Sequence, residues 1–289
     1  MAKKRTGIQL CYPFEERRLR DPKFGWSFPV IVQPKLDGER MRAICRENFP
    51  PILLSSTESR IISVPHIEEE LKNLNFFGEL DGELYIHGKD FSEISSIVGR
   101  SKNLHKNFSS MKYHIFDLIN NNPQCQRLID LKKLSPLQKS LKIVKNYVCF
   151  SFDDLMDKYS KIILEGYEGI IVRHFMAYYE RKRSRFVMKF KPKKNDIYLI
   201  SDILEGTGEH KNMVGAFLCQ GIDQTLFKVS AGEFNHVERK QIWKNKEVIK
   251  GKMLLIEYQN LTSLGIPRFG LAKKILEKHQ ENIFYQGIL

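Results

Sequence analysis

The sequence predicts an α+β protein of two domains, residues 1–195 and 196–289. In the first part, apolar runs of strand length are interspersed with segments of helical periodicity, which predicts sheets flanked by helices. The second part holds short β-like segments separated by glycine-containing turns, with one helical stretch, as is typical of a small all-β barrel. The polar run Pro192–Asp196 interrupts the pattern and marks the expected boundary.

The charge balance narrows the class of partner. The 289 residues include 47 Lys+Arg and 34 Asp+Glu, a formal net charge of +13. An excess of this size favours a polyanionic partner, with nucleic acid first and an anionic membrane surface second. The alternative is charge that only keeps the protein in solution.

The cysteines and the N-terminus indicate the compartment. The five cysteines are far apart in the sequence and form neither a zinc motif nor a disulfide framework. The basic N-terminus lacks the apolar segment of a signal peptide, and no apolar run approaches the roughly 18 residues of a membrane span. We therefore expect an intracellular protein, cytoplasmic or nucleoid-associated, without a membrane segment.

The first domain is expected to begin with an irregular segment, residues 1–29. Hydrophobic alternation then predicts a series of strands. Pro65 and Ser151 mark the starts of two predicted helices, and Ser135 with Pro136 marks a third, on which Leu141 shares a face with its apolar neighbours. The predicted strands cover Val30–Val32, Met41–Arg46, Phe76–Ile86, Tyr113–Ile119, Gly169–Arg173 and Phe186–Lys191.

In the second domain the apolar segments are shorter. One helical stretch follows Asn235, and the natural candidate for such a set of strands is the OB-fold. The predicted strands are Tyr198–Ile200, Ala216–Cys219, Leu226–Val229 and Met253–Tyr258.

The first candidate for chemistry is the turn Lys35–Arg40, which directly follows the apolar run Val30–Val32. A lysine attacks phosphorus only as the free amine, so its site must lower its pKa through burial or neighbouring cations. Arg40 is one such cation, and Asp37 is placed to orient the amine or a metal. The alternative is a solvated turn lysine.

Two carboxylates follow. Asp81-Gly82-Glu83 lies on a predicted strand, where a carboxylate that follows a glycine can accept a hydrogen bond from a ribose hydroxyl. The similar segment Gly78-Glu79-Leu80 leaves a second choice of residue open. Glu168 precedes Gly169 and a wholly apolar strand, a position suited to a divalent metal. An exposed strand end and a loop carboxylate are the alternatives.

Phe116 and a lysine pair complete the set. Phe116 is a candidate for stacking on a purine, although a strand phenylalanine is more often part of the core. Lys189 and Lys191 lie two residues apart on a strand and so on one face. Two ammonium groups on one face would neutralise a phosphate and the charge that develops on pyrophosphate.

In sequence order these segments resemble motifs I, III, IIIa, IV and V of the covalent nucleotidyltransferases. The C-terminal part is similar to the OB domain of small viral and bacteriophage-type ATP-dependent DNA ligases, and the resemblance covers nearly the whole chain from about residue 28. The segments that carry it are Lys35–Arg40, Asp81–Glu83, Tyr113–Leu118, Glu168–Arg173, Met188–Lys191, Glu205–Gly215, Lys228–Gly232 and Leu261–Phe269.

The resemblance implies a two-domain ligase core, in which an adenylyltransferase domain of antiparallel sheets flanked by helices is followed by an all-β OB-fold domain. Lys35 would attack the α-phosphate of ATP to form lysyl-AMP, the AMP would pass to the 5′-phosphate of a nick, and the 3′-hydroxyl would then expel it. The implied cofactors are ATP and Mg²⁺, with Mn²⁺ as a substitute, and the implied partner is nicked duplex DNA, bound by a monomer.

The resemblance also assigns roles to single residues. Lys35, Asp37, Lys189 and Lys191 would be catalytic, and Glu168 and Glu83 would bind the metal. The implied ATP contacts are Gln33 at the adenine edge, Arg40 and Glu83 at the ribose, Phe116 on the adenine, Glu168, Lys189 and Lys191 at the phosphates, and Arg268 near the pyrophosphate. Arg42, Arg60, Arg185, Lys193 and Lys194 are the expected DNA contacts.

This sequence departs from the family pattern in two places. The Ser-Arg that usually contacts the 5′-phosphate appears as Ser55-Ser56, so either Arg60 or Arg42 substitutes or the 5′-phosphate is sensed differently. Arg268-Phe269 is followed by Gly270, and Leu276 stands where the last basic residue is expected. Lys273 or Lys274 could supply that charge, but not the bidentate geometry of an arginine.

Two other functions remain open. RNA ligases and capping guanylyltransferases share the motifs, although the Lys-x-Asp-Gly turn and the Pro267-Arg268-Phe269 segment favour a DNA ligase. The third possibility is a nucleic-acid-binding protein that keeps the fold without the activity.

Overall fold

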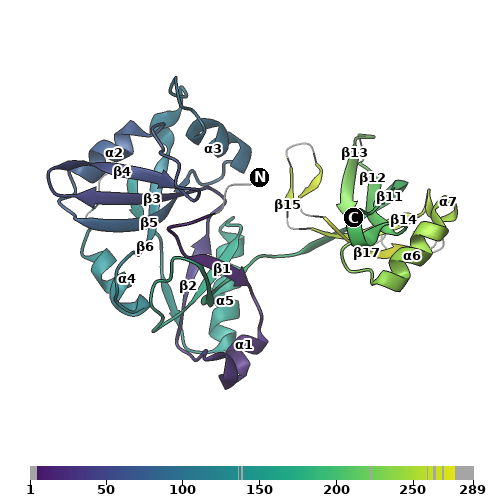
Figure 1. Ribbon diagram of the computed structural model, residues 1–289. Helices are drawn as coiled ribbons and strands as arrows, with labels where there is room; N and C mark the ends of the chain where they lie inside the picture. The colour runs from purple at the N-terminus through teal and green to yellow at the C-terminus, as the bar shows by residue number, and fades with distance from the viewer. Residues whose placement is uncertain are drawn as a thin grey trace. The chain divides into compact units, whose positions relative to one another are not determined.

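The computed structural model describes residues 5–135, 137, 139–221, 223–258, 260–262, 265–268 and 270–276. The chain forms two compact units, Met1–Lys191 and Pro192–Leu289 (Figure 1). The division falls slightly before the boundary expected after residue 195. Strand β11 (Lys194–Glu205) explains this, because Lys194 and Asn195 already pair with Tyr258 and Glu257 of the second unit. None of the described helices is long and apolar enough to cross a membrane.

One five-stranded sheet of the first unit, sheet A, carries the Lys35 strand near its middle. Its strand order is β1-β10-β9-β2-β8. Val30 and Val32 are buried against helix α5 (Phe152–Leu164). The predicted start of this helix is confirmed, and the Ser151 hydroxyl caps it by accepting the Asp154 N–H at 3.1 Å. The strands are β1 (Leu10–Pro13), β10 (Arg183–Phe190), β9 (Gly169–His174), β2 (Val30–Lys35) and β8 (Tyr147–Cys149).

The other five-stranded sheet, sheet B, has the order β4-β3-β5-β6-β7. Its apolar side chains form one core with α2 (Pro65–Lys72) and α3 (Phe91–Val98), in which Ile67 and Ile94 are fully buried. Its strands are β4 (Phe49–Ser55), β3 (Glu39–Arg46), β5 (Gly78–Tyr85), β6 (Lys112–Leu118) and β7 (Leu141–Ile143). The remaining helical segments of this unit are α1 (Arg17–Arg20), α4 (Gln124–Lys132) and the 3₁₀ turns Pro22–Phe24 and Phe108–Ser110.

Two expectations about this unit are wrong. The helix expected from Ser135 to beyond Leu141 is not formed in its second half, because Leu141–Ile143 pairs with β6 as a parallel strand, and pairing outweighs helical spacing over so short a run. Pro136 lies outside the described residues. The N-terminal segment is not wholly irregular either, since Leu10–Pro13 joins sheet A beside β10.

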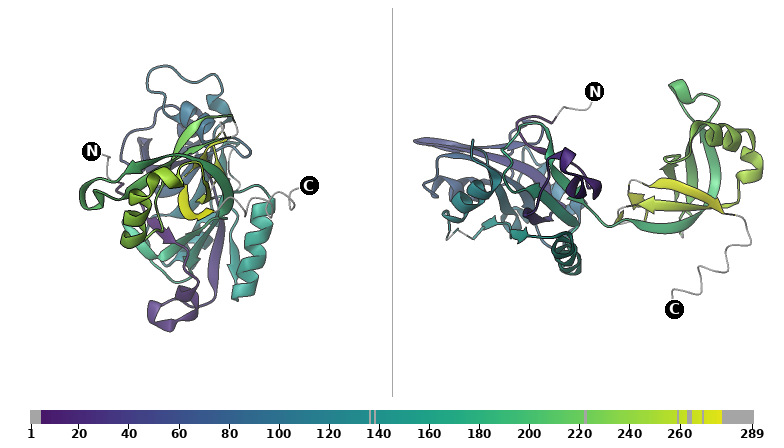
Figure 2. Two further views of the ribbon diagram at one scale, coloured as in Figure 1. Left: turned by 90° about the vertical axis from the view of Figure 1, so that its right-hand side faces the viewer. Right: turned by 90° about the horizontal axis from the view of Figure 1, so that it is seen from below.

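The second unit contains the expected closed barrel, with strand order β11-β12-β13-β17-β14. Phe217, Val229 and Leu254 fill its core, and α6 packs beside β12 (Figure 2). Asn235 and Glu238 form a capping box at the start of α6. The other elements are β12 (Val214–Gln220), β13 (Leu226–Ser230), β14 (Met253–Tyr258), β17 (Leu271–Leu276), α6 (His236–Lys244), α7 (Lys246–Ile249), β15 (Asn260–Leu261), β16 (Pro267–Arg268) and the 3₁₀ turn Gly208–His210.

Candidate active site

Lys35, Glu168 and Lys191 meet because β2, β9 and β10 are neighbours in sheet A. Lys35 is opposite Gly169 in the β2–β9 pairing, and Phe190 is opposite Ile170 in the β9–β10 pairing. The end of β2, the start of β9 and the end of β10 therefore lie side by side. The Lys35 ammonium is 2.5 Å from one Glu168 oxygen, and the Lys191 ammonium bonds to the other. We call these three residues the lysine–glutamate cluster.

Two glycines allow this close approach. A Cβ on Gly169 would lie 2.2 Å from the carbonyl oxygen of Phe190, and its φ of 158° is one that side chains rarely adopt. A Cβ on Gly38 would lie 2.2 Å from the carbonyl oxygen of Leu84. Glycine at these positions lets β10 lie against β9, and lets the turn after Lys35 lie against β5 next to Glu83.

The electrostatics of the cluster differ from what the sequence suggested. Burial alone would lower the pKa of Lys35, but the carboxylates of Glu168 and Glu83 outweigh it, so the pKa is raised. The expectation that the resting site lowers this pKa is therefore wrong. Lys191 behaves in the opposite way, because burial and the nearby Lys35 lower its pKa. In the resting protein Lys35 is an ion-paired ammonium.

The two candidate metal ligands have pKa values that are shifted in opposite directions. Glu168 keeps a lowered pKa in spite of its burial, since Lys35 and Lys191 stabilise the carboxylate. Burial raises the pKa of Glu83 to about 7. In the described part of the chain no three His, Cys, Asp or Glu side chains gather as a metal cage. Mg²⁺ commonly binds through one or two carboxylates and the phosphates of a substrate, so these two residues fit such an ion.

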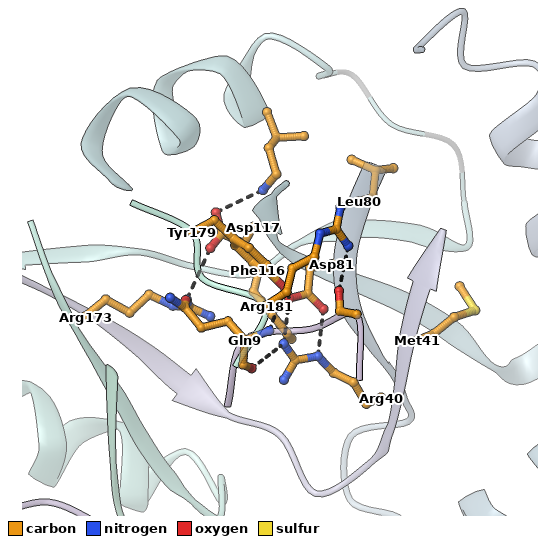
Figure 3. A network of polar contacts seen from close by, with 12 residues as sticks. Gln9, Arg40, Met41, Leu80, Asp81, Phe116, Asp117, Arg173, Tyr179 and Arg181 are labelled. Carbon is orange, nitrogen blue, oxygen red and sulfur yellow. Dashed lines mark hydrogen bonds and ion pairs between the residues drawn. The ribbon is translucent and has the colours of Figure 1, made fainter. Parts of the chain in front are cut away.

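Arg40 pairs with Asp81 of β5. Its guanidinium donates to both carboxylate oxygens of Asp81, at 2.7 and 2.6 Å (Figure 3). Asp81 and Glu83 lie two residues apart, hence on one face of β5. The two carboxylates of the Asp-Gly-Glu motif thus interact with different cations. Asp81 binds Arg40, whereas Glu83 is close enough to Lys35 to raise its pKa.

Phe116 lies at a β-bulge. The β5–β6 pairing passes from Asp81 opposite Asp117 to Gly82 opposite Ile115, which leaves Phe116 as the extra residue on β6. Bulges redirect side chains and occur often beside active sites. The ring is 9% exposed, with the guanidinium carbons of Arg40 and Arg173 at 4.5 and 5.3 Å from its centre. Phe116 therefore borders a polar region and is not enclosed by apolar neighbours alone.

Gln33 joins the two sheets. Its amide nitrogen donates to the Phe116 carbonyl at 2.8 Å and to the Asn146 side chain at 2.7 Å. Its amide oxygen accepts from Arg173 at 2.7 Å. These contacts hold the end of β2 beside the bulge, so Gln33 positions the surroundings of Phe116 even before any ligand is bound.

Sequence reasoning missed a buried group centred on Asp117. Its carboxylate accepts from Arg127 at 2.8 Å and from Arg173 at 3.2 Å, and all three side chains are buried. Gln9 joins this group to the Arg40–Asp81 pair, because its oxygens accept from both Arg40 and Arg173. We call Asp117, Arg127, Arg173, Arg40 and Asp81 the interior network. Asp117 directly follows the candidate Phe116, and Arg173 ends the strand that begins after the candidate Glu168. A charged residue within such an apolar strand is the signal that could have indicated a buried ion pair.

The expected DNA contacts differ in accessibility. Arg42 is buried and pairs with Glu58 at 2.6 Å and Glu79 at 2.5 Å, so its role as a phosphate contact is not supported. Arg60 has a side chain that is 53% exposed and lies 3.9 Å from Glu68. It is the better substitute for the missing arginine. Arg185, Lys193 and Lys194 are all exposed.

In the second unit, Arg268 lies on β16 opposite Asn260, and Phe269 is outside the described residues. Leu276 is buried in the barrel, which excludes it from contact with phosphate in this arrangement. Of the two lysines named in its place, Lys273 pairs with Glu233, whereas Lys274 is exposed.

Comparisons with known proteins agree with the architecture of a nucleotidyltransferase domain followed by an OB-like barrel. The family described as ATP dependent DNA ligase domain matches residues 25–191, and the DNA ligase OB-like domain matches residues 205–275. Since the first match alone covers more than half of the sequence, the chain belongs to the ATP-dependent DNA ligase family.

Among curated relatives, the DNA ligase of African swine fever virus (isolate Tick/South Africa/Pretoriuskop Pr4/1996) is 29% identical over 262 residues. That alignment covers 82% of this chain and 61% of the viral enzyme, so the chain spans under two thirds of that relative's length. The DNA ligase of Haemophilus influenzae is 29% identical over 194 residues, with 66% of this chain and 69% of the relative covered.

Solved structures show the same fold. A Lig E DNA ligase, described as binding DNA with a minimal scaffold, superposes with a TM-score of 0.71 at 23% identity, over 93% of this chain and 99% of that one. The ATP-dependent DNA ligase of bacteriophage T7, solved in complex with ATP, gives 0.56 at 18% identity, over 93% and 98%. At these identities the likeness concerns the fold.

Proposed function

We propose that the chain is an ATP-dependent DNA ligase that seals 5′-phosphate/3′-hydroxyl nicks in duplex DNA through a lysyl-AMP intermediate. The observation that carries the proposal is the lysine–glutamate cluster. A single amine is held at the end of a strand, with a carboxylate and a second ammonium beside it. This arrangement provides a nucleophile together with the positive charge that a polyphosphate requires.

In the first step Lys35 loses a proton, its nitrogen forms a bond to the α-phosphorus of ATP, and the bond to pyrophosphate breaks. Deprotonation requires that the ion pair between Glu168 and the Lys35 ammonium be broken, because that carboxylate raises the pKa of Lys35. Bound Mg²⁺, or Mn²⁺ in its place, would supply charge neutralisation at the phosphates and would take its protein oxygens from Glu168 and Glu83.

The other residues act on the rest of the nucleotide. Lys189 and Lys191 neutralise the α-phosphate and the departing pyrophosphate, with Asp37 orienting the amine. Arg40 and Glu83 bind the ribose, Phe116 stacks on the adenine and Arg268 contacts the pyrophosphate. Gln33 supports adenine binding indirectly, because its side chain positions Phe116 and Arg173 through the hydrogen bonds described above.

Binding to nicked DNA rests on charge. The exposed Arg60, Arg185, Lys193 and Lys194, within a chain of net charge +13, would contact phosphates without reading sequence. We further propose that residues 196–289 clasp the duplex and that the protein works as a monomer in the cytoplasm or at the nucleoid.

The test is covalent labelling with ATP carrying ³²P at the α-phosphate, in the presence of Mg²⁺. We expect the wild type to become labelled, and Lys35→Ala and Lys35→Arg to remain unlabelled, the latter because an arginine keeps the charge but stays protonated. The control Lys182→Ala, which removes an exposed lysine on the same unit, should label normally. Labelling by GTP in place of ATP would favour a capping guanylyltransferase, and a wild type that takes no label would refute the proposal.

Nick sealing completes the test. A panel of DNA/DNA, RNA/DNA and blunt-ended substrates should give the highest sealing rate on nicked DNA/DNA. Truncation after residue 195 should strongly impair sealing of nicks that already carry AMP. Unchanged sealing by the truncated chain would contradict the role proposed for residues 196–289.

A further inference from the structure

A short segment around Gln9 lies against the interior network, well before the residues that match the ligase domain family. Gln9 is 4% exposed. Its backbone N–H donates to the Tyr179 hydroxyl at 2.9 Å, and its backbone carbonyl accepts from Arg40 at 3.2 Å (Figure 3). Its side-chain oxygen accepts from Arg173 at 3.2 Å. One residue thus contacts both guanidiniums that flank Phe116.

Tyr179 reaches the same place from the loop between β9 and β10. Its hydroxyl donates to Asp81 at 2.5 Å, and Asp81 in turn holds the Arg40 guanidinium with both oxygens. Burial, together with the charge of Asp81, raises the pKa of Tyr179 well above its usual range, so the phenol stays a hydrogen-bond donor. Tyr179 is therefore connected to the Phe116 ring through two charged groups of fixed orientation, the Asp81 carboxylate and the Arg40 guanidinium.

The charge count explains why neutral acceptors matter here. The interior network has three guanidiniums, those of Arg40, Arg127 and Arg173, and two carboxylates. A guanidinium carries five N–H donors and no acceptor, so two carboxylates cannot satisfy all three. The two carbonyl oxygens of Gln9 accept from Arg40 and Arg173, the guanidiniums beside Phe116.

We infer that Gln9 and Tyr179 are positioning residues for the nucleoside half of ATP, because they fix Arg40 and Arg173 beside the Phe116 ring. The inference rests on the proposed function, which places adenine and ribose at Phe116 and Arg40. In the described part of the chain, the hydrogen bonds of Gln9 and Tyr179 reach Arg40, Arg173 and Asp81, so we expect the effect of both residues to be largest at the nucleoside end.

The experiment measures equilibrium binding of three probes by calorimetry. The first is α,β-methylene-ATP, which cannot react at the α-phosphate, the second is adenosine, and the third is inorganic tripolyphosphate. The variants are Tyr179→Phe, which removes one hydroxyl, and Gln9→Met, which removes the side-chain acceptor at nearly constant volume. Tyr178→Phe is the matched control, since Tyr178 is the neighbouring residue and is 62% exposed.

For Tyr179→Phe we expect the affinity for adenosine and for α,β-methylene-ATP to fall about tenfold, because Asp81 and Arg40 are then less firmly oriented before the nucleoside binds. The affinity for tripolyphosphate should stay within about twofold of the wild type. Gln9→Met should show the same selectivity with a smaller loss, and Tyr178→Phe should bind all three probes as the wild type does.

Three results would overturn the inference. Unchanged adenosine binding in both variants would show that the contacts do not matter for the nucleoside. An equal loss for adenosine and tripolyphosphate would indicate a loosened fold, which melting temperatures of the variants would register. A wild type that binds none of the probes would refute the nucleotide site as well. A wild type that binds them but takes no label from ATP refutes only the proposed activity and leaves the positioning role supported.

Discussion

The lysine–glutamate cluster and the interior network are two groups of paired charges in the same domain, built from different residues. The cluster uses lysine and glutamate at strand ends, and its side chains keep some contact with solvent. The network uses arginine and aspartate, and Asp81 and Asp117 are fully enclosed. The first arrangement can exchange partners, whereas the second cannot do so without breaking several hydrogen bonds.

This difference follows from the chemistry of the two cations. A guanidinium is planar, stays charged and binds a carboxylate through two parallel hydrogen bonds, which fixes direction. An ammonium is a point charge on a flexible stem, and its pKa shifts readily with its surroundings. The arginines hold the geometry around Phe116, and in the function proposed above the lysines would perform the step in which charge changes.

The largest effect is expected for Asp117→Ala. The change would leave Arg127 and Arg173 buried with one carboxylate fewer, and losing one member of a buried ion pair costs about 3–5 kcal/mol. Urea unfolding at pH 7 should show this loss in the free energy of unfolding. Asp117→Asn keeps the shape and one acceptor and should lose less. A change below about 1 kcal/mol for the alanine variant would mean that the network is not structural.

Lys191→Met should impair labelling by ATP much more than it impairs stability. Glu168 would keep Lys35 as its counterion, so no unpaired buried charge would remain, and we expect the free energy of unfolding to fall by less than the roughly 3 kcal/mol that a broken buried pair costs. The rate of labelling by ATP should fall about 10²–10³-fold, because one of the charges that stabilise the departing pyrophosphate is lost. Lys182→Met is the control. A variant that labels at the wild-type rate would remove Lys191 from the catalytic group.

The smallest effect is a pH dependence of stability from Glu83. Its pKa is raised to about 7 in the folded protein, against an ordinary value of 4.5, so between these pH values the folded state binds more protons than the unfolded state. Stability from this group is therefore lost as pH rises. Above pH 7, the free energy of unfolding of Glu83→Gln should exceed that of the wild type by about 2 kcal/mol, and its urea midpoint should be higher. Near pH 4 the two proteins should not differ.

Glu79→Gln provides the comparison of opposite sign. Glu79 lies on the same face of β5, but its pKa is lowered despite partial burial, because Arg181 and Arg42 bind the carboxylate. The wild-type advantage over this variant should therefore be present at neutral pH and disappear as pH falls. If both variants shifted stability in the same direction, the assignment of charge along β5 would be incorrect.

The sequence was sufficient to predict the two-domain α+β architecture and the residues of the lysine–glutamate cluster. Lys35, Glu168 and Lys191 stand at the ends of strongly apolar strands, where a charged residue is conspicuous. The cluster forms because those three strands are neighbours in sheet A, and the local sequence at each strand favours the strand that is observed. The raised pKa of Lys35 was not predictable, because it depends on which carboxylate lies closest in space.

The interior network could not be predicted in the same way. Gln9 and Arg173 are far apart in the chain, and neither the spacing nor the composition around Gln9 signals a buried contact. The Ser135 helix failed for a related reason, since Leu141 is placed by pairing with Tyr113 and not by its neighbours in sequence. Both cases show long-range contacts overriding local pattern.

The position of β10 in sheet A sets the order in which the site is completed during synthesis. This strand comes late in the chain but lies between β1 and β9, so β1 has no partner in the sheet until the chain reaches Arg183. Such long-range pairing is closed late in folding. A ribosome-bound chain that stops before β10 therefore has Lys35 and Glu168 but lacks Lys191 and the neighbour of β1. The first domain acquires its complete charge cluster only when its last strand has been made.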